Sequence, residues 1–124
     1  MKHIVYTEDV HIQSYANLVL LQRLYTQIES NRWSKVRKQF LEEELRKHNK
    51  LTCYYCNNSK LKLKSNKRNE QATVDHIVPK SQGGEAFSES NFVVCCSNCN
   101  KKKASKTFDE FINSKYIKKK KINI

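Results

Sequence analysis

Two pairs of cysteines constrain this chain more than any other feature. Cys53 and Cys56 are spaced C-x2-C, and Cys96 and Cys99 repeat that spacing after 39 intervening residues. Each pair presents two sulfurs from one tight turn, and closing the loop between the turns brings four thiolates together as a tetrahedral ligand set. The sequence therefore predicts a structural zinc site made of these four cysteines.

The length of 124 residues predicts one domain with a modest core, which gains from such a site. Structural zinc contributes about 10–16 kcal/mol of apparent binding free energy coupled to folding. The chain has five cysteines, no recognisable signal peptide and no apolar run long enough to cross a membrane. We therefore expect reduced thiols, a cytoplasmic location and no membrane partner, with Cys95 as a small buried hydrophobe.

The positive charge is concentrated around and after the cysteines. The chain carries 24 basic and 12 acidic residues, a net charge of +12, but the first 30 residues hold only 2 basic and 3 acidic groups. Clustered Lys and Arg favour nucleic acid as partner, because neutralising phosphates releases counterions. A membrane surface is disfavoured since the basic segments lack a strong apolar face. A Lys-rich composition that serves only solubility is the alternative.

Residues 1–50 predict a pair of antiparallel helices packed on the core. The first covers residues 10–30, and its apolar positions recur at helical spacing with a broad face: Ile12, Tyr15, Ala16, Leu18, Val19, Leu20, Leu21, Leu24 and Ile28. The segment 31–34 interrupts this pattern, and Ser34 can cap a second helix that runs to about residue 47. The apolar face is expected to be buried, while contact with a protein partner is the alternative.

Residues 51–115 predict a small mixed module. Residues 51–56 form a short strand, and the basic segment 57–70 is either a hairpin or a loop that orders on a polyanion. Residues 72–78 and 91–95 are strands joined by a polar connection that contains both glycines. A helix follows from residue 97 through Ala104, Phe108, Phe111 and Ile112, and residues 116–124 form a basic tail. The fold class is α+β.

One set of residues resembles a known family. Asp75-His76 on a β-branched strand, Asn91 and Cys96-x2-Cys99-Asn100, with the upstream cysteine pair, resemble the HNH endonucleases with the ββα-metal fold. The resemblance covers residues 51–112 and leaves the N-terminal helices outside it. It implies a hairpin and a helix that surround a catalytic site, with a four-cysteine zinc site beside them.

The resemblance implies a role for each of these residues. His76 is the general base that deprotonates water, since a neutral imidazole accepts a proton near pH 7. Asp75 and Asn100 offer oxygen ligands to a catalytic Mg²⁺ or Mn²⁺, and Asn91 ties the loop to the strand. Asn100 stands where the family often has His, which leaves the preferred metal open. Asp75 and His76 can address one phosphate only if the strand bends there.

The predicted function is a metal-dependent HNH endonuclease that nicks or cuts DNA, in a phage, mobile-element or defence context. The expected phosphate contacts are basic side chains on both sides of the strands: Lys60, Lys62, Lys64, Lys67, Arg68, Lys101, Lys102 and Lys103. One alternative is a non-catalytic zinc ribbon that only binds nucleic acid. The other is a nuclease subunit that stays inactive until its N-terminal helix meets a protein partner.

Overall fold

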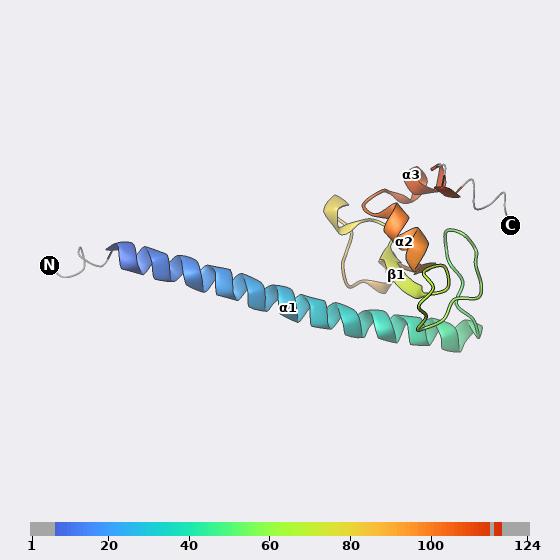
Figure 1. The fold of residues 1–124 in the computed structure, drawn as a ribbon, viewed down its shortest axis with the longest axis horizontal. Coiled ribbons are helices and arrows are strands. Elements are labelled where there is room, and N and C mark those ends of the chain that lie inside the picture. The colour runs from blue at the N-terminus through green and yellow to red at the C-terminus, as the bar shows by residue number, and fades with distance from the viewer. Residues whose placement is uncertain (1–6, 115, 118–124) are drawn as a thin grey trace. The chain divides into compact units, whose positions relative to one another are not determined.

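A computed structural model describes residues 7–114, 116 and 117 of the chain, with side chains from residue 13 onward. The chain divides into two compact units, residues 1–35 and 36–124, and each is described by itself. The main elements are three helices, α1 (Thr7–His48), α2 (Ser97–Lys103) and α3 (Phe108–Ile112), and two strands, β1 (Ala72–His76) and β2 (Phe92–Cys96) (Figure 1). Most of the predicted basic tail, residues 118–124, lies outside the described residues. An α+β fold is therefore confirmed.

The predicted helical pair is wrong, because α1 is one uninterrupted helix of 42 residues. The expected break at residues 31–34 contains no glycine or proline, and Asn or Ser inside a helix costs only about 0.7 kcal/mol or less relative to Ala. Asn31 also gains a partner within the helix, since the Gln27 side-chain amide donates to its Oδ1 at 2.9 Å. Ser34 is a helical residue rather than a cap.

The apolar side chains described in the first unit are exposed except for the half-buried Val19 and Trp33, so the predicted burial of this face is also wrong. Five of them occupy neighbouring positions on one side of α1, three or four residues apart, and each is more than half exposed: Leu18, Leu21, Leu24, Tyr25 and Ile28. We call this set the α1 row. Within the described residues, no helix is long and apolar enough to span a membrane.

In the second unit, β1 and β2 form a two-stranded antiparallel sheet, as predicted. The register is regular to its end, where Asp75 pairs with Val93 and His76 with Phe92. Successive residues of such a strand point to opposite faces. The ladder therefore shows no bend at Asp75 and His76 that would turn both towards one phosphate, and the two side chains leave the strand in opposite directions.

The helix predicted from residue 97 is two helices. Ala104 has a positive φ of 50° and ends α2, while Thr107 caps α3 by accepting the Glu110 backbone N–H at 3.2 Å. The Thr107 hydroxyl also bonds the Glu110 carboxylate at 3.1 Å. Thr107 therefore acts as the N-cap of a new helix where hydrophobic spacing suggested continuation.

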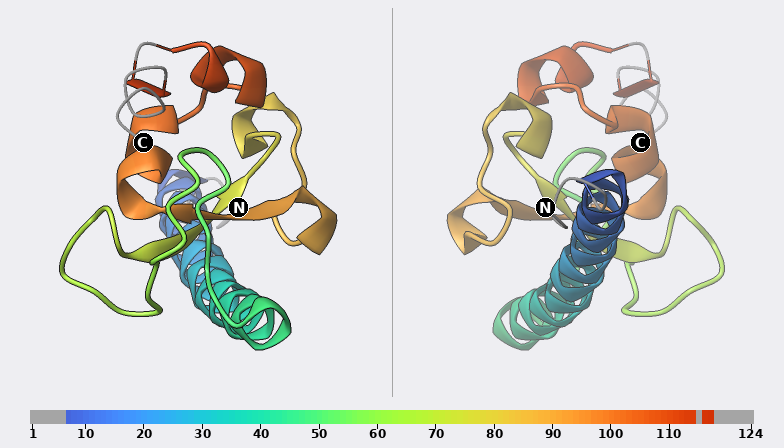
Figure 2. Two further views of the ribbon diagram at one scale, coloured as in Figure 1. Left: turned by 90° about the vertical axis from the view of Figure 1, so that its right-hand side faces the viewer. Right: turned by 90° about the vertical axis from the view of Figure 1, so that its left-hand side faces the viewer.

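The segment between α1 and β1 contains no regular strand. The predicted strand at residues 51–56 is reduced to an isolated bridge between Leu51 and Leu61 followed by the turn of the first cysteine pair. The basic segment up to β1 is a loop with one further bridge from Lys62 to Gln71, which agrees with the loop alternative rather than a hairpin (Figure 2). Its geometry is fixed by Gln71, whose side chain bonds the backbone of Ser65 and Leu63.

The core of the second unit is formed by side chains from several of its elements. Phe40 of α1 packs edge-on against Phe92 of β2, with ring centroids 5.4 Å apart. On α3, Phe111 is 1% exposed and packs against Tyr55 at 5.1 Å. Ile117 is fully buried as well, so the described end of the chain belongs to this core.

Candidate metal centre and catalytic site

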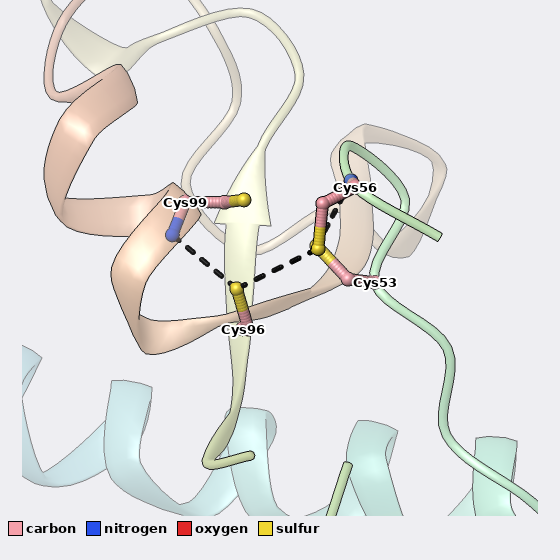
Figure 3. A group of neighbouring side chains, drawn as sticks. All are labelled: Cys53, Cys56, Cys96 and Cys99. Carbon is pink, nitrogen blue, oxygen red and sulfur yellow. Dashed lines mark hydrogen bonds between the residues drawn. The ribbon is translucent and has the colours of Figure 1, made fainter. Parts of the chain in front are cut away.

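The four predicted zinc ligands lie together. Cys53 and Cys56 come from the turn after Leu51, while Cys96 ends β2 and Cys99 lies in the first turn of α2 (Figure 3). All four are buried, and their sulfurs lie within 4.8 Å of one another. Cys95 is also fully buried but stands outside this cluster, where its sulfur lies 3.2 Å from the Thr73 hydroxyl.

The two turns are shaped as a metal site requires. In each, the second cysteine's N–H points to the first sulfur, from Cys56 to Cys53 at 3.5 Å and from Cys99 to Cys96 at 3.3 Å. Four thiolates around zinc at about 2.3 Å stand about 3.8 Å apart, and the Cys56 and Cys96 sulfurs are separated by 4.0 Å. The donor set and its spacing therefore fit zinc.

The thiols affect one another's ionisation. Side-chain hydrogen bonds from the neighbouring thiols, Cys53 first, lower the pKa of Cys56 and raise the pKa of Cys99. Burial disfavours negative charge at both positions. Four thiols cannot all ionise here without a compensating cation, which is the charge that a bound divalent metal supplies.

The imidazole of His76 is held by the loop between the strands. Its Nε2 lies 2.8 Å from the carbonyl oxygen of Ala86, and its ring meets Phe92 edge-on at 5.5 Å. A carbonyl only accepts, so Nε2 must carry the proton in this contact. Nδ1 is then the ring nitrogen that can take up a proton from water.

The side chain of Asn91 fixes the loop whose Ala86 carbonyl contacts His76. Its Oδ1 accepts the Val78 N–H at 2.9 Å, and its Nδ2 donates to the carbonyls of Val78 and Glu85, both at 3.0 Å. Gly84 makes this closure possible, because a Cβ there would stand 1.8 Å from the Val78 oxygen. Two of these contacts hold Val78, and the third holds Glu85, which precedes Ala86, the hydrogen-bond partner of His76.

Asp75 points to the opposite face, towards α2. Its Oδ2 lies 3.0 Å from the ammonium of Lys103 and also accepts the Tyr55 hydroxyl. Burial, followed by the hydrogen bond to Asp75, raises the pKa of Tyr55, so the phenol keeps the proton that it donates. Lys103 is fully buried and also donates to the His76 carbonyl at 3.1 Å, whereas the Asp75 residue is 8% exposed.

Asn100 lies beside the same strand. Its Nδ2 donates to the Thr73 hydroxyl at 3.1 Å and to the Val74 carbonyl at 3.4 Å. Asp75 follows Val74 directly, so a carboxylate and an amide from β1 and α2 occupy neighbouring positions. Such oxygen donors suit Mg²⁺ or Mn²⁺, which usually takes one or two protein ligands and completes its shell with water and phosphate oxygens. The donor chemistry therefore fits the implied catalytic cation.

The structure corrects one predicted nucleic-acid contact. Lys103 is fully buried and paired with Asp75, so its ammonium does not reach the surface. The other seven basic side chains predicted to contact phosphates are exposed. Among these, Lys62 stands 3.7 Å from Glu70, which offsets part of its charge.

Tyr55 and Lys103 are the contacts that sequence reasoning missed. Tyr55 stands in the sequence as a residue between two zinc ligands, and Lys103 as the end of a solvated lysine run. A usable indication existed for Lys103, because residues four apart share one helix face and Cys99 had to face inwards. The helix period therefore indicated that Lys103 faces inwards with Cys99, although not that it meets Asp75.

The hairpin, the following helix and the four-cysteine cluster define a small ββα module with a candidate metal site. The family model described as HNH endonuclease matches residues 53–116, just over half of the chain. The chain therefore belongs to the HNH endonuclease family. Comparisons with curated proteins and with solved structures find no match.

Proposed function

We propose that this protein hydrolyses DNA phosphodiester bonds with His76 as general base, a divalent cation at Asp75 and Asn100, and zinc at the four cysteines. The observation that carries the proposal is the His76 contact with Ala86: if Nε2 donates to that carbonyl, Nδ1 would be the nitrogen that accepts the proton. A module that only binds nucleic acid does not require an oriented imidazole. The oriented imidazole therefore favours the nuclease over the zinc-ribbon alternative.

In this mechanism His76 takes a proton from water while Phe92 and Ala86 keep its ring in place. Asn91 is a positioning residue that acts through the loop and does not contact the reacting groups itself. Asp75 and Asn100 would hold Mg²⁺ or Mn²⁺, which supplies charge stabilisation to the phosphate and its leaving oxygen. Because Asp75 and His76 leave opposite faces of β1 at its last two positions, the phosphate would have to reach both of them across the end of the strand. The exposed lysines of the 60–68 loop, with Lys101 and Lys102, would contact phosphates and position the duplex.

The test is cleavage of plasmid DNA by parent protein and by His76→Ala, in Mg²⁺ or Mn²⁺. We expect the variant to keep zinc and DNA affinity but to lose about 10²- to 10⁴-fold in rate, the usual cost of removing a general base. Asn91→Ala is the graded comparison, since it loosens the loop without removing the base. Cleavage by folded His76→Ala at the parental rate would overturn the mechanism and favour the zinc-ribbon binder.

The location follows from the zinc site. Thiols that bind zinc must stay reduced, and all five cysteines are free. We therefore expect the protein to act in a reducing compartment such as the cytoplasm. Zinc content of protein isolated without chelator tests the premise, and zinc-free folded protein would contradict it.

The exposed α1 row supports the alternative that the nuclease needs a protein partner. We propose that this partner is a second copy of the chain, which packs against the row. Leu18, Leu21, Tyr25 and Ile28 follow the alternating spacing of three and four residues that forms a coiled-coil seam. The first 30 residues have a net charge of −1, so two copies of a strongly basic chain repel each other least here.

Light scattering after size exclusion tests the second copy. The parent should be dimeric at micromolar concentration, and Leu21→Glu with Ile28→Glu should be monomeric. Glu at the exposed, polar positions Gln22 and Gln27 is the matched control and should leave the dimer intact. A monomeric parent would refute the dimer, and in that case cleavage activity of the purified chain would decide whether another partner is required.

A further inference from the structure

The buried contact between Lys103 and Asp75 has a consequence for the catalytic cation. The Lys103 ammonium lies 3.0 Å from the Asp75 carboxylate and is completely shielded from solvent. Ion pairs of this kind persist because each charge offsets the desolvation of the other. In the absence of a metal, Lys103 is the formal positive charge that balances Asp75.

Lys103 is fixed rather than free to withdraw. Its ammonium donates to the His76 carbonyl at 3.1 Å, so it is bonded to both residues of the Asp-His dipeptide. Its main chain lies in the last turn of α2, four residues after the cysteine that anchors this helix to the cluster. The positive charge therefore stays beside the carboxylate.

We infer that Lys103 is a built-in counter-ion that competes electrostatically with the divalent cation for Asp75, an inference that rests on the proposed function. A cation that joins Asp75 meets a like charge within hydrogen-bond distance of the same carboxylate, with little water to screen the two. The protein without DNA therefore binds Mg²⁺ or Mn²⁺ weakly. A substrate phosphate adds the missing negative charge, so cation and DNA bind cooperatively.

The competing view is that Lys103 only orders the site. In that case its loss should loosen Asp75 and weaken cation binding. Electrostatic competition predicts the opposite sign, because removing the ammonium leaves a carboxylate without a cationic partner. The sign of the change in metal affinity therefore separates the two roles.

The test is Mn²⁺ titration of DNA-free protein by calorimetry and by electron paramagnetic resonance of the free ion. Divalent cations left from purification are removed by gel filtration before the titration, because a chelator would also remove the zinc. Lys103→Met removes the charge and keeps much of the length. We expect it to bind Mn²⁺ at least about tenfold more tightly than the parent, since the repulsion acts at short range in a buried site.

Three further variants make the result decisive. Lys103→Gln is neutral but still donates a hydrogen bond, so it should also gain affinity, and it replaces the methionine variant if that one fails to fold. Lys80→Met removes the same charge at an exposed position, where water screens it, and should match the parent. Asp75→Asn should abolish the binding measured in each background.

The outcomes separate this inference from the function on which it rests. Binding that depends on Asp75 but is equal or weaker in both Lys103 variants would overturn the counter-ion role and leave the cation site standing. Binding that is indifferent to Asp75→Asn in parent and variants alike would overturn the cation site itself, and the counter-ion role with it. Tighter Asp75-dependent binding in the neutral variants, but not in Lys80→Met, is the expected result.

Discussion

The first and second units contain similar apolar side chains but bury them to different extents. Leu20 in the first unit is 56% exposed, whereas Leu51 next to the first cysteine pair is 1% exposed. A leucine is buried only where other elements approach it, and in the second unit the cysteine cluster joins residues 53–56 to residues 96–99. Burial in this chain therefore follows long-range connection rather than local hydrophobicity.

The same contrast exists along α1 itself. Phe40 and Leu41 near its C-terminal end are 9% and 5% exposed, and Phe40 packs on Phe92 of β2. Leu21 and Ile28 in the same helix are 61% and 65% exposed. One helix thus provides a core anchor in the second unit and an apolar row in the first, and substitutions at the two places should differ sharply.

The largest effect should come from breaking the cysteine cluster. Cys53→Ser removes one of four ligands, and structural zinc typically supplies about 10–16 kcal/mol of apparent binding free energy coupled to folding. We expect the second unit to unfold, with loss of zinc by metal analysis and of sheet and turn signals by circular dichroism. The helical signal of residues 13–35 need not disappear in parallel.

The control for this change is Cys95→Ser. This residue is equally buried but lies outside the cluster, beside the Thr73 hydroxyl. We expect it to retain a full equivalent of zinc. If Cys53→Ser and Cys95→Ser lost zinc to the same extent, the assignment of the four ligands would be wrong.

The next largest effect should come from the anchor of α1 on the sheet. Phe40→Ala removes a buried ring in edge-on contact with Phe92, and such truncations cost about 3–5 kcal/mol. Denaturant unfolding followed by aromatic fluorescence measures the change. Because Phe92 also contacts His76, cleavage should fall as well, whereas the zinc content should stay at the parental level.

A smaller and more local effect should follow from filling the space at Gly84. A Cβ at this position would stand 1.8 Å from the Val78 oxygen, so the loop must move, at a cost of about 1–3 kcal/mol typical of overpacking. Gly84→Ala should therefore displace the Ala86 carbonyl from His76. We expect the cleavage rate to fall strongly, while the second unit stays folded with only this modest loss in the free energy of unfolding.

Gly83→Ala separates strain from steric conflict. Gly83 has a φ of +85°, but an added Cβ would meet nothing within 4 Å, so its substitution strains only the backbone. Its effect on cleavage should be smaller than that of Gly84→Ala. Equal loss of activity in both variants would show that backbone strain, rather than the Val78 contact, controls the loop.

Much of the second unit was predictable because its constraints are local in sequence. The spacing of Cys53 with Cys56 and of Cys96 with Cys99 indicates the cluster, and two β-branched segments around a glycine pair indicate the hairpin. The predicted strands start or end within two residues of β1 and β2. The four sulfurs then meet as the spacing requires.

The remaining features depend on information that spacing does not contain. Asn31 and Ser34 lower the helix propensity of segment 31–34 too little to break a helix. The two predicted helices are therefore one continuous helix, α1. The apolar spacing of residues 10–30 fits a core helix and an exposed row equally well, because periodicity describes a face without its neighbour. The pairing of Lys103 with Asp75 required knowing which side of α2 faces β1.

The smallest effect should come from the α1 row, and it tests the comparison most directly. Leu21 is 61% exposed, so Leu21→Ser removes little buried surface and costs the folding of the second unit less than about 0.5 kcal/mol. Unfolding is measured at low protein concentration, where self-association contributes nothing to stability. Phe40→Ala is the matched change within the same helix. Leu21→Ser would contradict this expectation if, in dilute protein, it lowered the free energy of unfolding of the second unit as much as Phe40→Ala does. Residues 13–35 would then unfold cooperatively with the core of the second unit, and burial could not be the property that separates the two regions.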